Sequence, residues 1–339
     1  MLGHDPTAST AENYRRFAAL EARGTSPVYE RICAGISADR DLLGFLGELP
    51  PRCRQPNLLL GVVRYAFGVQ PDYGAFRDTV LGHRAEITEL LLHRRTQTNE
   101  PGRCAAMLPI LASLPQPLAL LEVGASAGLC LMPDRYGYRY GDHALAGGPP
   151  VIDCRLVGAT RPPLPARLPE VAWRRGIDLS PLDVRDPDDV RWLEALVWPG
   201  QTARERYLRE SLVLAREDPP PVVQGDLTEI LEDVAADAPA DATLVVAHTA
   251  VLAYLPAEQR EDVVRRIRAL GAAWIASEAP GVLGFPARPG ALTERGHFVV
   301  TVGGTLTAGE PVARMGPHGD WLQWSANVQR RPAAQCSGR

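Results

Sequence analysis

The stretch Leu118-Ala-Leu-Leu-Glu-Val-Gly-Ala-Ser-Ala-Gly-Leu129 is the most informative part of this chain for its fold. Its apolar first half contains one acid, Glu122, and small residues follow from Gly124 to Gly128 before apolar residues resume. This order predicts a buried strand, a tight loop and the start of a helix, which Pro133 cuts short, at the carboxyl end of a parallel sheet. Small residues let a ligand approach the backbone, and a helix start supplies free N–H donors.

Two phosphate-binding interpretations of this loop fail on the residues themselves. A dinucleotide fingerprint needs a third glycine at the position that Leu129 occupies. A P-loop needs a lysine, and all 36 basic residues of the chain are arginines. The absence of lysine also excludes Schiff-base chemistry and a lysine general base.

A serine hydrolase is a third interpretation, because Gly124-Ala-Ser-Ala-Gly128 matches the Gly-x-Ser-x-Gly nucleophile elbow with Ser126 as the nucleophile. Hydrolases of that fold place several strands and an oxyanion loop before the elbow, whereas residues 1–117 show mostly helical spacing. A carboxylate at Glu122 is also unusual in a buried strand, but it is natural if the side chain faces a ligand. Both features disfavour the hydrolase.

The segment Glu122-x-Gly124-x-x-x-Gly128 resembles the cofactor turn of S-adenosylmethionine (SAM) methyltransferases. Most of the chain resembles an uncharacterised bacterial family, a domain of unknown function with a methyltransferase-like core. The motifs that carry this likeness lie at 97–100, 103–105, 134–141, 176–184 and 192–199. One departure is Cys130, where the family usually has asparagine. The resemblance implies a Rossmann-like fold more than a particular reaction.

The pattern along the chain predicts an α/β protein, and the resemblance implies that its sheet is a Rossmann-like SAM-methyltransferase sheet. Residues 1–117 are expected to form a helical cap domain and 118–330 the sheet domain, with a disordered tail at 331–339. A Gly- and Pro-rich β insertion is expected at about 141–170, with a hairpin around Val151–Val157. Alternation over His297–Leu306 and Trp321–Val328 predicts an antiparallel hairpin that closes the sheet.

Polar residues end the predicted strands at Glu122, Asp178, Asp226, His248 and Glu278. The carboxyl ends of parallel strands converge on one crevice. The resemblance implies that SAM binds there, with Glu122 and the loop residues Gly124, Ser126 and Gly128 at its amino-acid end. Asp178 would then accept from the ribose hydroxyls and Asp226 from the adenine amino group. The alternative is that such acids cap the helices that follow.

The candidate catalytic residues are His248, as a general base, and Glu100. The candidate substrate contacts are Asn99, Arg103, Tyr138 and Glu278, with Arg103 pairing to a carboxylate. Arg103 and His248 are expected to face one crevice from two sides. These residues also have purely structural interpretations. His248 could be a histidine with satisfied hydrogen bonds at the sheet edge, and Asn99 could be the N-cap of an ordinary helix. Tyr138 could belong to a strand whose tyrosines lie in the core. No spacing of His, Cys, Asp or Glu indicates a metal site.

Composition disfavours several further classes of protein. The formal charge of −4, with arginines interspersed among acids, disfavours nucleic-acid binding. No apolar run is long enough for a membrane span, no leader is evident, and six dispersed cysteines indicate no disulfide framework, so a cytoplasmic protein is expected. The function predicted is SAM-dependent methylation of a small molecule. The alternatives are a non-methyl displacement or elimination on the same fold, with a partner subunit or as a homo-oligomer, and a non-catalytic ligand-binding protein.

Overall fold

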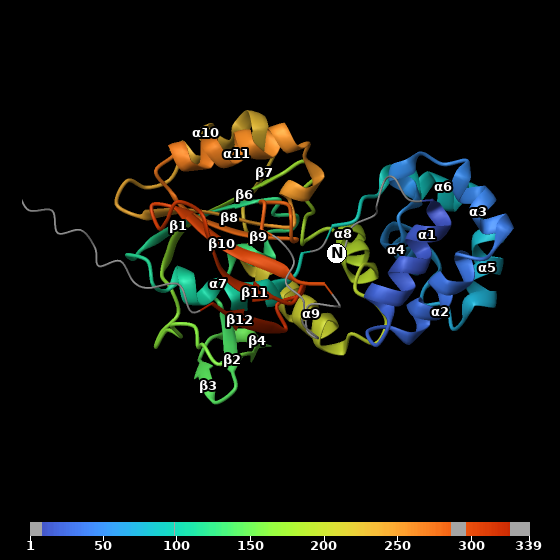
Figure 1. The fold of residues 1–339 in the computed structure, drawn as a ribbon, viewed down its shortest axis with the longest axis horizontal. Helices are drawn as coiled ribbons and strands as arrows, with labels where there is room; N and C mark the ends of the chain where they lie inside the picture. The colour runs from blue at the N-terminus through green and yellow to red at the C-terminus, as the bar shows by residue number, and fades with distance from the viewer. Residues whose placement is uncertain (1–8, 98, 286–295, 326–339) are drawn as a thin grey trace, which may run out of the picture.

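The computed structural model describes residues 9–97, 99–285 and 296–325. The chain is a mixed α/β protein with two lobes, one of helices and one built around a large, mostly parallel sheet (Figure 1). The expected tail at 331–339 lies outside the described residues.

The helical lobe has its own core, in which Ile32, Phe45 and Leu59 are fully or almost fully buried. Aspartates begin two of its helices, because Asp39 and Asp72 accept hydrogen bonds from the first-turn N–H groups. Trp192 also lies in this core, so a helix from the middle of the chain completes the lobe. The helices are α1 (Thr10–Arg16), α2 (Pro27–Ile36), α3 (Arg40–Gly47), α4 (Pro56–Phe67), α5 (Tyr73–Gly82), α6 (Arg84–His93) and α8 (Pro187–Ala195).

In the described residues the large sheet has nine strands in the order β5-β12-β11-β10-β9-β8-β1-β6-β7. The run from β7 to β9 is parallel throughout, and β1 lies at its centre between β6 and β8. Strands β10, β11 and β12 continue the sheet in antiparallel fashion. The strands are β1 (Leu118–Val123), β5 (Arg155–Leu156), β6 (Val171–Asp178), β7 (Val222–Gln224), β8 (Thr243–Thr249), β9 (Ala273–Glu278), β10 (Phe298–Gly304), β11 (Glu310–Met315) and β12 (Trp321–Trp324).

Helices cover both faces of this sheet (Figure 1). One face packs against α7 (Cys104–Leu111), α9 (Thr202–Glu217) and a small sheet. The other face packs against α10 (Leu227–Ala236) and α11 (Ala257–Ala269). Along β1 the side chains alternate, with Leu118 and Leu120 on the α7 face and Leu121 and Val123 on the α10 face. Helix α7, expected in the cap, therefore belongs to the sheet lobe.

The β insertion is present, but the hairpin expected around Val151–Val157 is wrong. The small sheet joins β2 (Tyr136–Tyr140), β3 (His143–Leu145) and β4 (Gly148–Asp153) in the order β3-β2-β4, and its hairpin is β2–β3. After Cys154 the chain leaves this sheet, and β5 pairs with β12 of the large one. Local alternation predicts a strand here, but it does not say which distant strand is its partner.

The closing hairpin expected from His297–Leu306 and Trp321–Val328 is also wrong. Strand β10 pairs directly with β9, and the unpredicted strand β11 separates β10 from β12. The sequence of β11, Glu310-Pro-Val-Ala-Arg-Met315, hides its alternation, because a proline and two charged residues fall in six positions. Residues 326–328 lie outside the described part.

Candidate functional site

The carboxyl ends of β1, β6, β8 and β9 lie side by side at one edge of the sheet. Glu122, Asp178, His248 and Glu278 are the polar residues at these ends, as the sequence predicted. The alternation of side chains divides them between the two faces. Glu122 follows Leu118 and Leu120 on the α7 face, whereas His248 contacts Trp274 on the α10 face.

The loop from Gly124 to Gly128 turns sharply and requires its glycines. Gly124 has φ +72° and Gly128 has φ +73°, a region that favours glycine. A side chain at Gly124 would clash with Val251, and one at Gly128 would lie 2.8 Å from the Pro220 Cβ. Substituting Gly128 would therefore strain the backbone of the loop, in addition to any effect on a ligand bound there.

The backbone donors of this loop are largely used within the protein, which differs from the free helix start expected. The N–H groups of Gly124 and Ala125 donate to the Ile177 carbonyl, and that of Ser126 donates to Asp178 Oδ2 at 2.8 Å. The segment after the loop is a single 3₁₀ turn, Leu129–Leu131. Proline cannot continue a helix, so Pro133 explains the early end.

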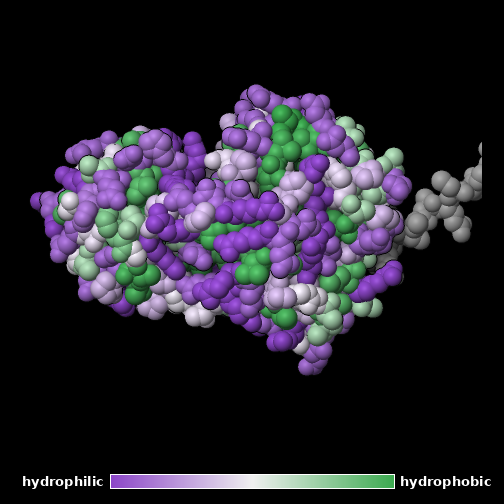
Figure 2. All heavy atoms as spheres, turned by 180° about the vertical axis from the view of Figure 1, so that it is seen from behind, coloured by the Kyte–Doolittle hydropathy of each residue, from purple (hydrophilic) through white to green (hydrophobic). Residues whose placement is uncertain are grey.

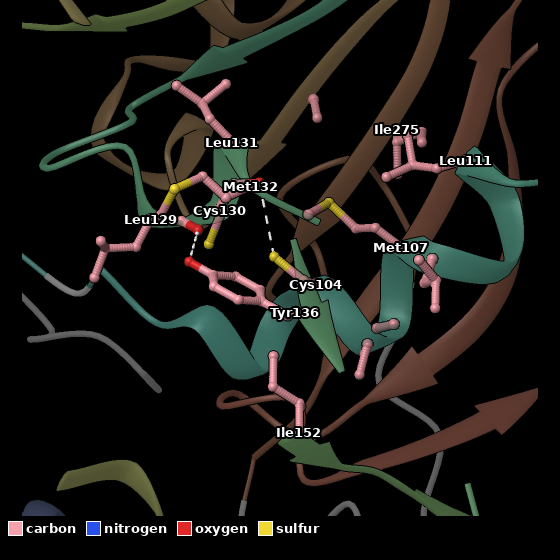
Figure 3. Close-up of a cluster of buried hydrophobic side chains, with 14 of the residues drawn as sticks. Cys104, Met107, Leu111, Leu129, Cys130, Leu131, Met132, Tyr136, Ile152 and Ile275 are labelled. Carbon is pink, nitrogen blue, oxygen red and sulfur yellow. Dashed lines mark hydrogen bonds between the residues drawn. The ribbon is translucent and has the colours of Figure 1, made fainter. Parts of the chain in front are cut away.

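The 3₁₀ turn is held from the core side by two buried side chains (Figure 3). The Tyr136 hydroxyl donates to the Leu129 carbonyl at 2.7 Å, and the Cys104 thiol lies 3.7 Å from the Cys130 carbonyl. These contacts satisfy carbonyls that a continued helix would otherwise satisfy. The turn after the loop is therefore fixed by contacts within the protein.

Residues just before α7 also brace the loop. Asn99 spans it, because its amide donates to the Ala125 carbonyl at 3.0 Å and accepts from the Leu129 N–H at 2.9 Å. Gln97 lies beside it and accepts from the Ser126 hydroxyl at 2.6 Å. The sequence placed Asn99 at the site, and the structure gives it the geometry of a loop brace rather than of an exposed substrate contact.

Glu100 is buried in an ion-paired network. Its Oε2 accepts from Arg204 Nε of α9, and its Oε1 accepts from the Gly102 N–H at 3.4 Å. Arg103 lies next to it, with Nε donating to the Pro317 carbonyl at 3.0 Å and the guanidinium 5.5 Å above the Phe298 ring. Burial lowers the pKa of Arg103. Arg204 was missed, because its surrounding sequence has the pattern of a solvated helix face.

Glu122 is 6 % exposed, and within residues 9–97, 99–285 and 296–325 its Oε2 meets no hydrogen-bond partner. Burial raises the pKa of this carboxyl well above its ordinary value of 4.5, while nearby Arg103 opposes the shift. A buried acceptor without a partner costs free energy, and such groups concentrate at functional sites.

His248 is fully engaged inside the protein. The Trp274 indole donates to its Nε2 at 3.0 Å, so Nδ1 carries the proton and donates to Glu278 Oε1 at 2.8 Å. Glu278 Oε1 also accepts from the N–H groups of Val251 and Leu252, which fixes the turn after β8. This arrangement favours a positioning role for His248 over the general-base role expected.

The packing of Arg103 and His248 does not support the shared crevice expected for them. Arg103 packs on Phe298, whose strand faces α7, whereas His248 packs on Trp274, which faces α10. The two side chains therefore lie on opposite faces of the sheet. The sequence placed both near strand ends but did not determine the face of each.

Three other candidates have defined structural roles. Asp178 accepts one backbone N–H on each oxygen, from Ser126 and Ser180. Asp226 caps α10 by accepting from Thr228, and these hydrogen bonds lower its pKa. Tyr138 is fully buried, and its hydroxyl donates to the Pro133 carbonyl at 2.7 Å. Its geometry favours the core interpretation.

The elbow interpretation has one structural feature in its favour, the φ of +53° at Ser126. The Ser126 hydroxyl donates to Gln97, however, and both ring nitrogens of His248 are occupied elsewhere. A serine nucleophile needs a base within hydrogen-bond reach.

Wild-type protein should therefore show no labelling by a fluorophosphonate probe, because Ser126 lacks an activating base. Intact-mass spectrometry after incubation with the probe measures this. Stoichiometric modification that disappears in Ser126→Ala would contradict the prediction.

No group of His, Cys, Asp and Glu that could hold a metal ion occurs among residues 9–97, 99–285 and 296–325. Within those same ranges, none of the helices combines the length and apolar character that crossing a membrane demands. The fold and the strand-end residues thus define a mixed α/β protein with buried polar groups at one sheet edge.

Residues 11–324 match the model of a family described as an uncharacterized protein conserved in bacteria, DUF2332. The chain belongs to this family. No curated protein and no solved structure matches the chain.

Proposed function

We propose that this chain is a SAM-dependent methyltransferase that acts on a small molecule. The observation that carries the proposal is the parallel run β7-β6-β1-β8-β9, with the glycine loop directly after the central strand. In open parallel sheets, ligands bind where the strand order reverses, which is here at β1. The chain leaves β1 through Gly124 and ends the neighbouring strand β6 at Asp178.

The residues present fit a SAM molecule at this edge. The unpartnered Oε2 of Glu122 is an acceptor for an ammonium group. Each Asp178 oxygen accepts one backbone N–H and retains a lone pair for a ribose hydroxyl. Asp226 follows β7 in the chain and caps α10, and in this proposal it accepts from the adenine amino group. When bound, SAM supplies an electrophilic methyl group.

The protein's own contribution would be alignment and the exclusion of water. The brace formed by Gln97 and Asn99 holds the loop in one geometry, so little ordering would be needed when a ligand binds. Glu278 and His248 hold the turn after β8 in the same way. Incorporation of a radiolabelled methyl group from SAM into small organic acids measures the activity.

A second candidate is a ligand-binding protein of the same fold without catalysis. It is favoured because both candidate catalytic side chains already have partners within the protein. His248 is hydrogen-bonded to Trp274 and Glu278, whereas Glu100 is paired with Arg204. SAM binding without methyl transfer to any acceptor would support this candidate over the first.

Glu122→Gln should raise the free energy of unfolding of the ligand-free protein by about 1–2 kcal/mol at neutral pH, because it removes a buried carboxyl whose ionisation burial disfavours. The folded-state pKa of Glu122 lies above its ordinary value of 4.5, so wild-type stability falls as pH rises from 4.5 through the folded pKa. The advantage of the variant should therefore grow with pH. Urea unfolding at pH 4.5 and pH 7.5 measures it.

The same variant should bind SAM more weakly, because the ammonium group loses its charged acceptor. Glu12→Gln is the matched control, since Glu12 lies on the surface of α1. A stability advantage of Glu122→Gln that shrinks at higher pH, or unchanged SAM affinity, would contradict this role.

A further inference from the structure

A groove of about 840 Å³ lies between the two lobes. This volume falls within the range of roughly 300–1,000 Å³ that is usual for small-molecule sites. The helical lobe contributes Glu21 and Asn57, and the sheet lobe contributes Arg103, α9 and the turn around His318. Seen from behind, the junction between the lobes shows hydrophobic residues among hydrophilic ones (Figure 2).

Among the described residues, four arginines line the groove: Arg103, Arg155, Arg204 and Arg206. Two of them are held in place, Arg103 buried at 6 % exposed and Arg204 partly buried with its side chain 12 % exposed. Arg103 is positioned by the Pro317 carbonyl, and Arg204 by Glu100. Arg204 Nη1 also donates to Gln201 Oε1, so both guanidinium groups are held in one orientation, and the planar guanidinium matches the geometry of a carboxylate.

The carboxylates of this wall are shared between arginines. Asp153 Oδ1 lies 3.1 Å from Arg139 Nη1, and Asp153 Oδ2 lies 3.8 Å from Arg206 Nη2. Glu100 pairs with Arg204 and also acts on Arg103. Asp320 is the remaining acid of this wall. The positive charge of nearby Arg155 opposes the rise that burial causes in the pKa of Asp320. In the described part of the chain, the four arginines of the groove thus face three carboxylates, Glu100, Asp153 and Asp320, which leaves a small excess of positive charge.

Glu21 on the opposite wall reduces this excess only in part. Burial raises the pKa of Glu21 to about 7, so it is incompletely ionised at neutral pH. The groove as a whole therefore favours an anion.

The groove also offers flat apolar surfaces. The Trp198 indole is anchored, because its Nε1 donates to Asn57 Oδ1 at 3.1 Å and its ring lies 5.0 Å from that of Phe17. The Tyr207 ring lies 5.0 Å below the Arg206 guanidinium. Both rings line the groove together with Leu196. Rigid aromatic walls beside arginines suit a ligand with a flat apolar body and one acidic group.

We propose that this groove binds an aromatic carboxylic acid, whose carboxylate pairs with the arginines and whose ring packs against Trp198 and Tyr207. The role of this groove as the acceptor site for methyl transfer rests on the proposed function. Binding of the acid to the groove does not rest on it, so binding is tested without SAM.

The probe is 2-naphthoate, and its neutral isostere 2-naphthamide is the comparison. Isothermal titration calorimetry should give at least about tenfold tighter binding of the acid, because a charge-assisted pair replaces a neutral hydrogen bond. The double variant Arg155→Gln, Arg206→Gln should weaken naphthoate binding by about tenfold and leave naphthamide binding unchanged. Arg155 is exposed and the Arg206 side chain is 48 % exposed, so the fold should tolerate both changes.

Arg265→Gln is the matched control, because Arg265 lies on α11 outside the groove. Equal affinities for acid and amide, no binding of either probe, or the same loss in the Arg265 control would overturn the proposal. Naphthoate binding in a protein that does not bind SAM would support the groove proposal while the methyltransferase proposal fails. SAM binding without naphthoate binding would overturn the groove proposal and leave the methyltransferase proposal intact.

Discussion

Replacing Glu100 with glutamine should lower the free energy of unfolding by about 3–5 kcal/mol, because it leaves the buried Arg204 guanidinium without its carboxylate. The Glu100 side chain is 3 % exposed, and the ion pair joins residues 104 positions apart in sequence. The pair thereby holds α9 against the segment that precedes α7. Urea denaturation monitored by circular dichroism measures the loss.

Glu12→Gln is the control for this prediction, because Glu12 pairs with Arg15 on the surface, where both side chains are more than 40 % exposed. Such pairs contribute about 0–1 kcal/mol. If Glu100→Gln destabilises no more than Glu12→Gln, the network does not hold these elements together.

Gly128→Ala should cost about 2–4 kcal/mol. The left-handed backbone at φ +73° disfavours a side chain by about 1–2 kcal/mol, and the new Cβ would lie 2.8 Å from the Pro220 Cβ, which adds the cost of overpacking. The loss should appear in protein without any ligand. Thermal unfolding of the free protein is therefore the measurement.

Gly44→Ala is the matched control, since Gly44 lies inside α3 with no atom near its missing side chain. That change should be neutral or stabilising by up to about 1 kcal/mol. A Gly128→Ala protein as stable as Gly44→Ala would show that the loop does not need glycine for its own conformation. In that case a substitution at Gly128 would test ligand binding alone.

Local signals predicted the central part of the fold. The apolar run from Leu118 to Val123 and the small residues after it gave β1 and its loop, because strand burial and positive φ depend on nearby residues. The strands that end at Asp178 and Glu278 were predicted on the same basis. The end of the turn at Leu131 follows from Pro133.

Contacts between distant residues were not predictable. Arg204 resembles any solvated helix residue in sequence, and only the fold brings it to Glu100. The Trp274 indole that occupies His248 Nε2 comes from the neighbouring strand, and no local pattern indicates which sheet face it occupies. The groove arginines come from β5, α9 and the segment before α7, so their convergence depends on the packing of the lobes.

Calorimetric titration with SAM and with S-adenosylhomocysteine shows whether the sheet edge at Glu122 is a SAM site. We expect one site for each ligand and weaker binding to Glu122→Gln. A hundredfold excess of ligand over its dissociation constant should also stabilise the protein by about 2.7 kcal/mol. Absence of both heat and stabilisation with either ligand at millimolar concentration would contradict the proposed methyltransferase function.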